Sequence, residues 1–342
     1  MQNLILFTFN TLKKFTKTRK GETKFGERVQ LISNFNNNYE DIAALDVDYV
    51  IFGVSEDIGV IANYGNTGAY KAWEATVKVL LNTQNNSFLD ASRVLILGHL
   101  NYSEALNQLR NENLCKKERI ALARKLTEVV DKDVTHLVYS IVKAKKTPII
   151  IGGGHNNAYG NIKGSSLALN KKVNVVNLDA HHDFRALEGR HSGNGFSYAH
   201  YEGFLKNYFI FGLHENYISE ENLKAVRDTQ GIEFNTFEDI SIRKQLRFSK
   251  ELKRAKSHVA TTNFGIEIDC DAIENMPSSA MTPSGFSTTK ARKFVTTFAK
   301  ETNATYLHIC EAAPDKKNDK KVGKFITYLI TDFIKAHANR NN

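Results

Sequence analysis

Short apolar runs alternate with helical segments along most of this chain, and this alternation constrains the fold more than any other feature. The apolar runs cover residues 49–54, 94–97, 148–151, 173–178, 208–211, 264–268 and 305–309. Segments with helical periodicity lie between most of them, at 67–81, 117–145, 220–227, 288–300 and 322–337. Strands buried on both faces read as unbroken apolar runs, and intervening helices indicate parallel pairing. We therefore predict a three-layer α/β/α sandwich around a mainly parallel sheet.

The chain contains no internal repeat, low-complexity segment or linker rich in proline and glycine. Its 342 residues suffice for one large core, so we expect a single domain over residues 1–342, with 1–40 as an N-terminal extension. The three cysteines are widely spaced and form no disulfide or zinc-ribbon pattern, which favours a reducing cytoplasm. Basic residues follow the apolar patch at 4–7, which is the wrong order for a signal peptide.

The formal net charge of +9 raises the question of an anionic partner. Lysine and arginine are spread along the chain, and the densest late run, at 316–324, also contains Asp319. Such a run usually forms a solvated surface, and no apolar run approaches the length of a membrane span. We therefore expect a small-molecule substrate and neither a nucleic acid nor a membrane as partner.

Four of the predicted strands run directly into residues that can bind metal ions or exchange protons. GGGH (152–155) follows the run at 148–151, and DAHHD (179–183) follows 173–178. DCD (269–271) follows 264–268, and CEAAP (310–314) follows 305–309. In open α/β sheets, ligands bind outside the carboxyl ends of the strands. All four motifs should therefore meet at one edge of the sheet.

Such a meeting would place four carboxylates close together, those of Asp179, Asp183, Asp269 and Asp271. Carboxylates at this separation remain ionised only if cations compensate their charge. Residues i and i+2 of an extended segment face the same side, so the aspartates of each motif should point inward together. The alternative for any one aspartate alone is a helix cap or a tight turn.

Two imidazoles complete the expected metal site. By the same alternation His181 points inward with the aspartates and His182 points away, while His155 comes from GGGH. Oxygen ligands with two imidazoles suit Mn²⁺ or Mg²⁺ better than structural Zn²⁺. A ligand set with shared carboxylates suggests two ions, roughly 3.5 Å apart and bridged by a water.

In this order and spacing, GGGH, DAHHD, IDCD and CEAAP resemble the metal signature of the ureohydrolase superfamily, which includes arginase, agmatinase, guanidinobutyrase and formimidoylglutamase. The resemblance extends from about residue 50 to the end of the chain. It implies the arginase–deacetylase type of α/β sandwich and two manganese ions. One ion would be held by His155, Asp179, Asp183 and Asp269, and the other by His181, Asp179, Asp269 and Asp271.

Three details resemble formimidoylglutamase in particular. The stretch EDIGVIANYGNTGAYKAW (56–73) resembles a stretch of that branch. Gly154 stands where arginases usually carry an aspartate, and Arg185 stands where they usually carry an asparagine. A guanidinium suits a carboxylate-rich substrate such as N-formimino-L-glutamate. The alternative for Arg185 is a surface salt bridge.

The resemblance also implies the chemistry. A metal-bridged hydroxide would attack the carbon of a linear amidine. Glu311 would hold the cationic nitrogen end of the substrate, and Asp271 would relay a proton to the leaving nitrogen. The products would be glutamate and formamide from N-formimino-L-glutamate, or urea and an amine from a guanidino compound.

The loop after the second motif, HSGNGFSYAH (191–200), departs from arginases. The resemblance implies that Ser192 and Asn194 bind a substrate carboxylate, and the alternative is a simple glycine-rich turn. Phe196 occupies the place where arginases carry a histidine, and His191 or His200 could replace that histidine. In NYGN (63–66), two further residues, Asn63 and Asn66, are candidates for the pocket mouth or ordinary turn formers.

Other functions compete with formimidoylglutamase. Arginase or another guanidino-compound hydrolase, such as an agmatinase or guanidinobutyrase, would use the same metal chemistry. A single-zinc deacetylase would need fewer carboxylates than this sequence supplies. A metal-binding protein without turnover is supported only by the missing loop histidine. The family is often oligomeric, so a homo-oligomer is a further expectation, but no feature of the sequence indicates an interface.

Overall fold

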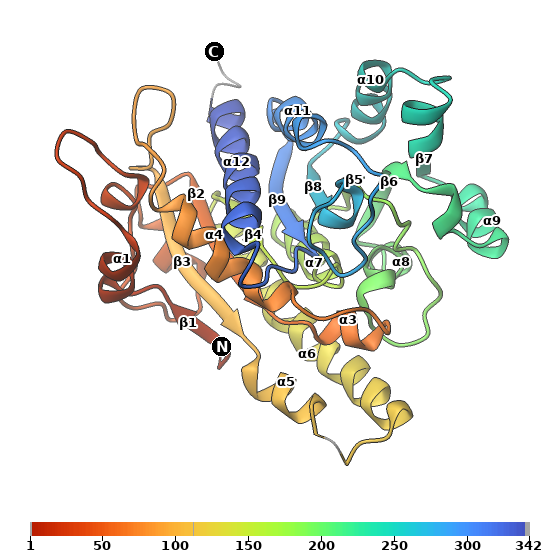
Figure 1. Ribbon diagram of the computed structural model, residues 1–342, viewed down its shortest axis with the longest axis horizontal. Coiled ribbons are helices and arrows are strands. Elements are labelled where there is room, and N and C mark those ends of the chain that lie inside the picture. Colours follow the sequence, from red (N-terminus) through yellow and green to blue (C-terminus); the bar gives the residue numbers. More distant parts are fainter. Residues whose placement is uncertain (1, 112, 339–342) are drawn as a thin grey trace.

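A computed structural model describes residues 2–111 and 113–338, and its centre is a nine-stranded sheet with helices on both faces (Figure 1). Along the sheet the order is β1-β3-β2-β4-β9-β8-β5-β6-β7. β1 runs antiparallel to β3, and all other neighbours are parallel. The predicted three-layer, mainly parallel sandwich is confirmed. The strands are β1 (Leu4–Leu6), β2 (Tyr49–Ser55), β3 (Val94–Asn101), β4 (Thr147–Ile151), β5 (Val173–Leu178), β6 (Leu205–Leu213), β7 (Ile232–Thr236), β8 (Phe264–Asp269) and β9 (Ala304–Cys310).

The helices divide into two layers according to the hydrophobic cluster to which they contribute. α4, α10, α11 and α12 pack on one face, and α6, α7 and α8 pack on the other. The helices are α1 (Phe9–Phe15), α2 (Tyr39–Ala43), α3 (Ile58–Ala62), α4 (Ala72–Leu80), α5 (Ser103–Leu109), α6 (Lys116–Lys143), α7 (Asn157–Leu169), α8 (Gly195–Tyr201), α9 (Glu220–Asp228), α10 (Phe248–Val259), α11 (Thr288–Ala299) and α12 (Asp319–Ala338). Within the described residues, none of these helices combines the length and the apolar character needed to cross a membrane.

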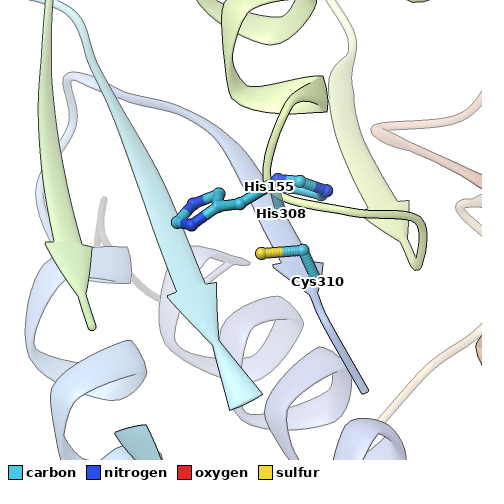
Figure 2. A group of neighbouring side chains, drawn as sticks. All are labelled: His155, His308 and Cys310. Atoms are coloured by element: carbon cyan, nitrogen blue, oxygen red, sulfur yellow. The ribbon is translucent and has the colours of Figure 1, made fainter. Parts of the chain in front are cut away.

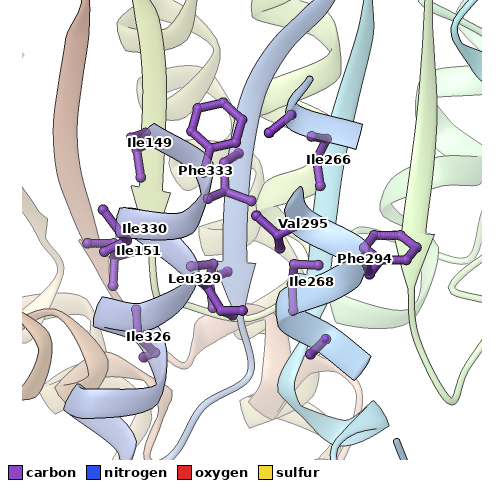
Figure 3. Packing of buried hydrophobic residues seen from close by; sticks show 14 of the residues in the cluster. Ile149, Ile151, Ile266, Ile268, Phe294, Val295, Ile326, Leu329, Ile330 and Phe333 are labelled. Carbon is purple, nitrogen blue, oxygen red and sulfur yellow. The ribbon is translucent and has the colours of Figure 1, made fainter. Parts of the chain in front are cut away.

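Alternation along the central strands explains their unbroken apolar sequences. Ile149 and Ile151 of β4 face α12, whereas Ile150 between them belongs to the cluster under α6 (Figure 3). The first face also receives Ile266 and Ile268 of β8, opposite Val295 and Phe294 of α11. Because both faces are covered, the apolar residues that point to either face of such a strand are buried, and each contributes roughly 25 cal/mol per Å² of apolar area.

Close packing of α7 on α6 fixes the start of α7, which immediately follows GGGH. A Cβ at Gly160 would lie 2.7 Å from Cγ1 of Val134, and one at Gly164 would lie 2.6 Å from the carbonyl oxygen of Thr135. These two glycines, one turn apart, therefore allow the helices to approach to near backbone contact. The segment between β4 and α7 is therefore fixed at one end by the sheet and at the other by the packing of α7 on α6.

Candidate metal centre

The four motif-bearing strands are immediate neighbours, in the order β4-β9-β8-β5. GGGH follows β4 and DAHHD follows β5, while Asp269 ends β8 and Glu311 follows β9. Because these strands are parallel, their carboxyl ends lie at the same edge of the sheet. The order of strands along the sheet thus brings all four motifs together.

His155 is at the centre of this group. Its Nδ1 lies 2.8 Å from Oδ2 of Asp183, 3.1 Å from Oδ2 of Asp269 and 3.2 Å from Oδ2 of Asp179. One ligand atom from each of these four residues lies within 4.8 Å of all the others. All four side chains are buried or nearly so. Four buried ligand atoms that converge from separate strands fit a cation with mixed oxygen and imidazole ligands.

His181 and Asp271 form the second half of the group. Nδ1 of His181 lies 3.7 Å from Oδ1 of Asp179 and 3.8 Å from Oδ2 of Asp271. Asp179 therefore presents one oxygen to His155 and the other to His181. All six residues that the sequence indicated as metal ligands lie together. His182 is not one of them: its Nδ1 accepts from the backbone N–H of Phe184 at 3.0 Å, although the residue lies in the lining of the adjacent cavity.

The electrostatics of the group favour a positive occupant. Burial, with the charges of Asp271 and Asp179, raises the pKa of Asp269 well above its usual range. Although burial opposes protonation, the carboxylates of Asp179 and Asp271 raise the pKa of His181 to about 10. The first shift favours neutral Asp269 and the second favours protonated His181, so both reduce the net negative charge of the group. The residues present therefore fit divalent cations, which would offset the same buried charge.

Glu311 combines a strained backbone with an open bonding position. Its φ is 60°, in the left-handed region that non-glycine residues seldom adopt. Oε1 accepts from the backbone N–H of His155 at 2.7 Å, whereas Oε2 is buried and has no partner among the described residues. Burial and the charge of Asp271 raise the pKa of Glu311 to about 8. A buried carboxyl with a free oxygen is suited to a cationic ligand group.

A cavity of about 400 Å³ opens onto these residues, a volume suited to a small molecule. Of the residues indicated by the sequence, its lining includes Asn63, His181, Asp183, Arg185, Ser192, Asp269, Asp271 and Glu311. It also includes residues that the sequence did not indicate, among them Tyr217, Ser219, Asn222 and Ser279. Metal-type ligands and potential substrate contacts thus share one cavity.

Arg185, Asn63 and Ser192 form the part of the lining that can recognise an anion. The Arg185 side chain is 48% exposed and lies 3.3 Å from Oε1 of Glu188. Nδ2 of Asn63 donates to Oγ of Ser192 at 3.2 Å. Exposed pairs of this kind contribute little to stability, so Arg185 is free to exchange Glu188 for a ligand carboxylate.

Asn194 and Asn66, in contrast, do not line the cavity. Asn194 is fully buried, its Oδ1 accepts from the backbone N–H of His191 at 3.0 Å, and its Nδ2 donates to the carbonyl of Gly189 at 2.9 Å. Nδ2 of Asn66 donates to the carbonyl of Ser279 at 2.9 Å. Both side chains therefore stabilise the loops that carry lining residues.

Phe196 is a core residue. Its ring stacks on Tyr208 at 4.3 Å between centroids and forms a T-shaped pair with the His155 ring at 5.1 Å. Neither His191 nor His200 lines the cavity in its place. His191 is fully buried, and its Nδ1 accepts from the backbone N–H of Gly193 at 3.1 Å. No histidine of this loop therefore lines the cavity.

A second group of potential ligands, His155, His308 and Cys310, lies buried together (Figure 2). His308 is committed to Glu267 through its Nδ1, and the Cys310 thiol donates to the carbonyl of Ile268 at 3.6 Å. Burial raises the pKa of Cys310 well above its usual range, so this thiol stays protonated and is a poor metal ligand. Oε2 of Glu267 also lies 3.5 Å from Nε2 of His155, so Glu267 supports His155 at the ring nitrogen that does not face the three aspartates.

Glu56, which directly follows β2, shapes the GGGH turn. It is fully buried and accepts hydrogen bonds from five donors on two segments, one of them Nδ2 of Asn156 at 3.3 Å. The other four donors are the backbone N–H groups of Ile58 (2.6 Å), Gly59 (3.2 Å) and Gly154 (2.8 Å) and Nδ2 of Asn157 (2.9 Å). One carboxylate thus joins the start of α3 to the turn that presents His155.

Replacing Glu56 by glutamine should therefore lower the free energy of unfolding by about 2–4 kcal/mol, because one acceptor oxygen becomes an amide NH2 group that faces buried donors. Glu74→Gln is the matched control, since that exposed carboxylate only pairs with Lys78 and should contribute no more than about 0.5 kcal/mol. Urea denaturation of both variants measures the difference. Equal stabilities would show that Glu56 does not hold the turn.

Comparisons with known proteins agree with this geometry. A family model described as the arginase family matches residues 48–334. Formimidoylglutamase of Streptococcus pyogenes is 24% identical over 303 residues, which are 86% of each chain. Trypanosoma cruzi formiminoglutamase with Mn²⁺ aligns with a TM-score of 0.73 and 22% identity, over 93% of this chain and 99% of that one. Formimidoylglutamase of Bacillus subtilis aligns with a TM-score of 0.72 and 15% identity, over 94% of each chain.

Proposed function

The chain belongs to the arginase family and is a hydrolase of carbon–nitrogen bonds in linear amidines, and on this premise we propose that it converts N-formimino-L-glutamate and water to glutamate and formamide at a binuclear manganese centre. One observation carries the metal chemistry: three carboxylates from two strand ends lie 2.8–3.2 Å from Nδ1 of His155. The names of the relatives and the presence of Arg185 in the cavity support the formimino substrate.

The two ions would use the ligand sets that the family resemblance implies. His155 and Asp183 would bind the first ion only, and His181 and Asp271 would bind the second only. Asp179 and Asp269 would be shared between them. When bound, the two ions lower the pKa of a water molecule enough to supply hydroxide near neutral pH.

Glu311 binds the protonated amidine of the substrate. Its free Oε2 is buried beside Asp271, so a cationic amidine would lower the pKa of Glu311 from about 8 and ionise it. The resulting charged hydrogen bond fixes the amidine carbon within reach of the attacking oxygen.

Asp271 transfers the proton. Its Oδ1 accepts from the backbone N–H of Ala280 at 3.1 Å, and its Oδ2 accepts from Oγ of Ser279 at 3.3 Å. These contacts orient the carboxylate toward the cavity. Both protons of the attacking water end on the amine nitrogen. The first passes through Asp271 as the bond between that nitrogen and the formimino carbon breaks, and the second comes from the hydroxyl group newly bound to that carbon as formamide forms, so glutamate leaves with a protonated amine.

A panel of substrates tests the proposal. After loading with Mn²⁺, the protein is assayed with N-formimino-L-glutamate, L-arginine, agmatine and 4-guanidinobutyrate, and both formamide and urea are measured. We expect formamide from the first compound and a kcat/KM at least about 10²-fold higher than for the others, because agmatine lacks a carboxylate and arginine presents a different spacing. Urea as the main product would assign a guanidino substrate instead, and no product from any compound would support a metal-binding protein without turnover.

Arg185→Ala should raise KM for N-formimino-L-glutamate about 10- to 100-fold, because a charged hydrogen bond to a substrate carboxylate is lost. Arg93→Ala is the control. Arg93 directly precedes β3, at the amino ends of the strands and so away from the cavity, and pairs with Asp46 and Asp48. An unchanged KM in the Arg185 variant would mean that Arg185 only pairs with Glu188.

A further inference from the structure

Four rings lie nearly parallel in a series that runs from the cavity into the core. The centroid of His181 is 5.1 Å from that of Tyr217, with 18° between the planes. Tyr217 is 5.2 Å from His214 at 6°, and His214 is 4.7 Å from Phe237 at 17°. His181, a candidate metal ligand, thus lies at one end of the stack, and the buried Phe237 lies at the other.

The backbone fixes the middle of this stack. The N–H of His214 donates to the carbonyl of Ala180, next to His181, at 2.9 Å, and the N–H of Tyr217 donates to the carbonyl of His214 at 3.0 Å. Phe237 is 5% exposed and forms a T-shaped pair with Phe286 at 5.1 Å between centroids. The Tyr217 ring therefore has a defined position before any ligand binds.

The two candidate metal-binding histidines are supported differently. His155 is enclosed on all sides, with a side chain 1% exposed, Glu267 at 3.5 Å from Nε2 and Phe196 against its ring. The His181 side chain is 29% exposed, and Tyr217 covers a face of its ring. An imidazole that must meet an ion in one orientation loses affinity when its support is removed.

We propose that Tyr217 is a positioning residue for one ion only: its ring holds the imidazole of His181 so that Nδ1 faces the carboxylates of Asp179 and Asp271. This inference rests on the proposed binuclear centre. Because His181 would bind the second ion and not the first, loss of the Tyr217 ring should weaken the second ion selectively.

Titration with Mn²⁺, followed by the electron paramagnetic resonance signal of the free ion, gives both affinities for the intact chain. We expect wild type to bind two ions per chain. In Tyr217→Ala the first ion should bind as in wild type and the second about 10- to 100-fold more weakly. Tyr217→Phe, which keeps the stacked ring, should restore the second affinity, whereas Tyr217→Leu, which keeps only bulk, should not.

The outcomes separate the inference from its premise. Fewer than two ions in wild type would overturn the binuclear centre and the inference with it. If wild type binds two ions and Tyr217→Ala binds both with wild-type affinity, only the role of Tyr217 is overturned. Equal weakening of both ions in Tyr217→Ala, or a second ion lost in Tyr217→Phe, would also overturn it. Circular dichroism melts of the metal-free variants check folding, which should be retained because Tyr217 is 42% exposed.

Discussion

Replacing Asp269 by asparagine should prevent binding of both manganese ions and lower the rate of amidine hydrolysis at least about 10³-fold, since hydroxide is supplied only by the metal-loaded protein. Asp269 lies 3.1 Å from Nδ1 of His155 and belongs to both proposed ligand sets. An amide is neutral and a weaker ligand for hard cations than a carboxylate. The substitution keeps the shape of the side chain and the acceptor for the backbone N–H of Asp271, now 2.7 Å from Oδ1.

In the absence of metal, the same substitution should stabilise the fold. Burial and the charges of Asp271 and Asp179 raise the pKa of Asp269, so the ionised form opposes folding above the ordinary pKa of an aspartate. A neutral asparagine removes this cost, and the metal-free variant should melt at a higher temperature than metal-free wild type near neutral pH.

Thermal melts with and without Mn²⁺ therefore provide a crossed test. At a concentration of 100 Kd, one ion stabilises the wild type by about 2.7 kcal/mol, whereas the Asp269 variant should gain almost nothing. Asp228→Asn, at an exposed site, is the control and should respond to Mn²⁺ like wild type. An equal rise in melting temperature for Asp269→Asn would show that this carboxylate is not a shared ligand.

The ends of the central strands could be predicted from the sequence because the strands themselves were unmistakable. β4, β5, β8 and β9 are buried on both faces, so each appears as an apolar run with a polar stop. The strand order β4-β9-β8-β5 could not be read from the sequence, since it depends on how distant segments pair. The prediction that the motifs meet rested instead on the general rule that ligands of open α/β sheets bind at the carboxyl ends of the strands.

Edge elements and residues that act through packing could not be predicted in this way. β1 has three residues, and β7 (IEFNT) mixes polar with apolar side chains, so neither resembles a buried strand. Tyr217 comes from a short turn after β6, and only the folded chain places its ring against His181. Glu56 and Glu267 did leave a signal: Glu56 follows a strand end, and Glu267 precedes Asp269 by the two-residue period of a strand.

Replacing Glu311 by glutamine should lower kcat/KM for N-formimino-L-glutamate roughly 10²- to 10³-fold. The loss corresponds to removal of one partner from a desolvated charge pair, which costs about 2–5 kcal/mol. Oε2 of Glu311 is buried without a hydrogen-bond partner among the described residues, so it is free to pair with the amidine. Steady-state kinetics on the Mn²⁺-loaded variant measure the effect.

The metal content of the same variant decides what Glu311 does. Glu311 is not one of the six proposed ligands, and the amide oxygen of glutamine can still accept from the backbone N–H of His155, which lies 2.7 Å from Oε1. Both ions should therefore bind Glu311→Gln with wild-type affinity while turnover falls. If manganese were lost together with activity, Glu311 would act by holding His155 in place, and the amidine would need a different partner in the cavity.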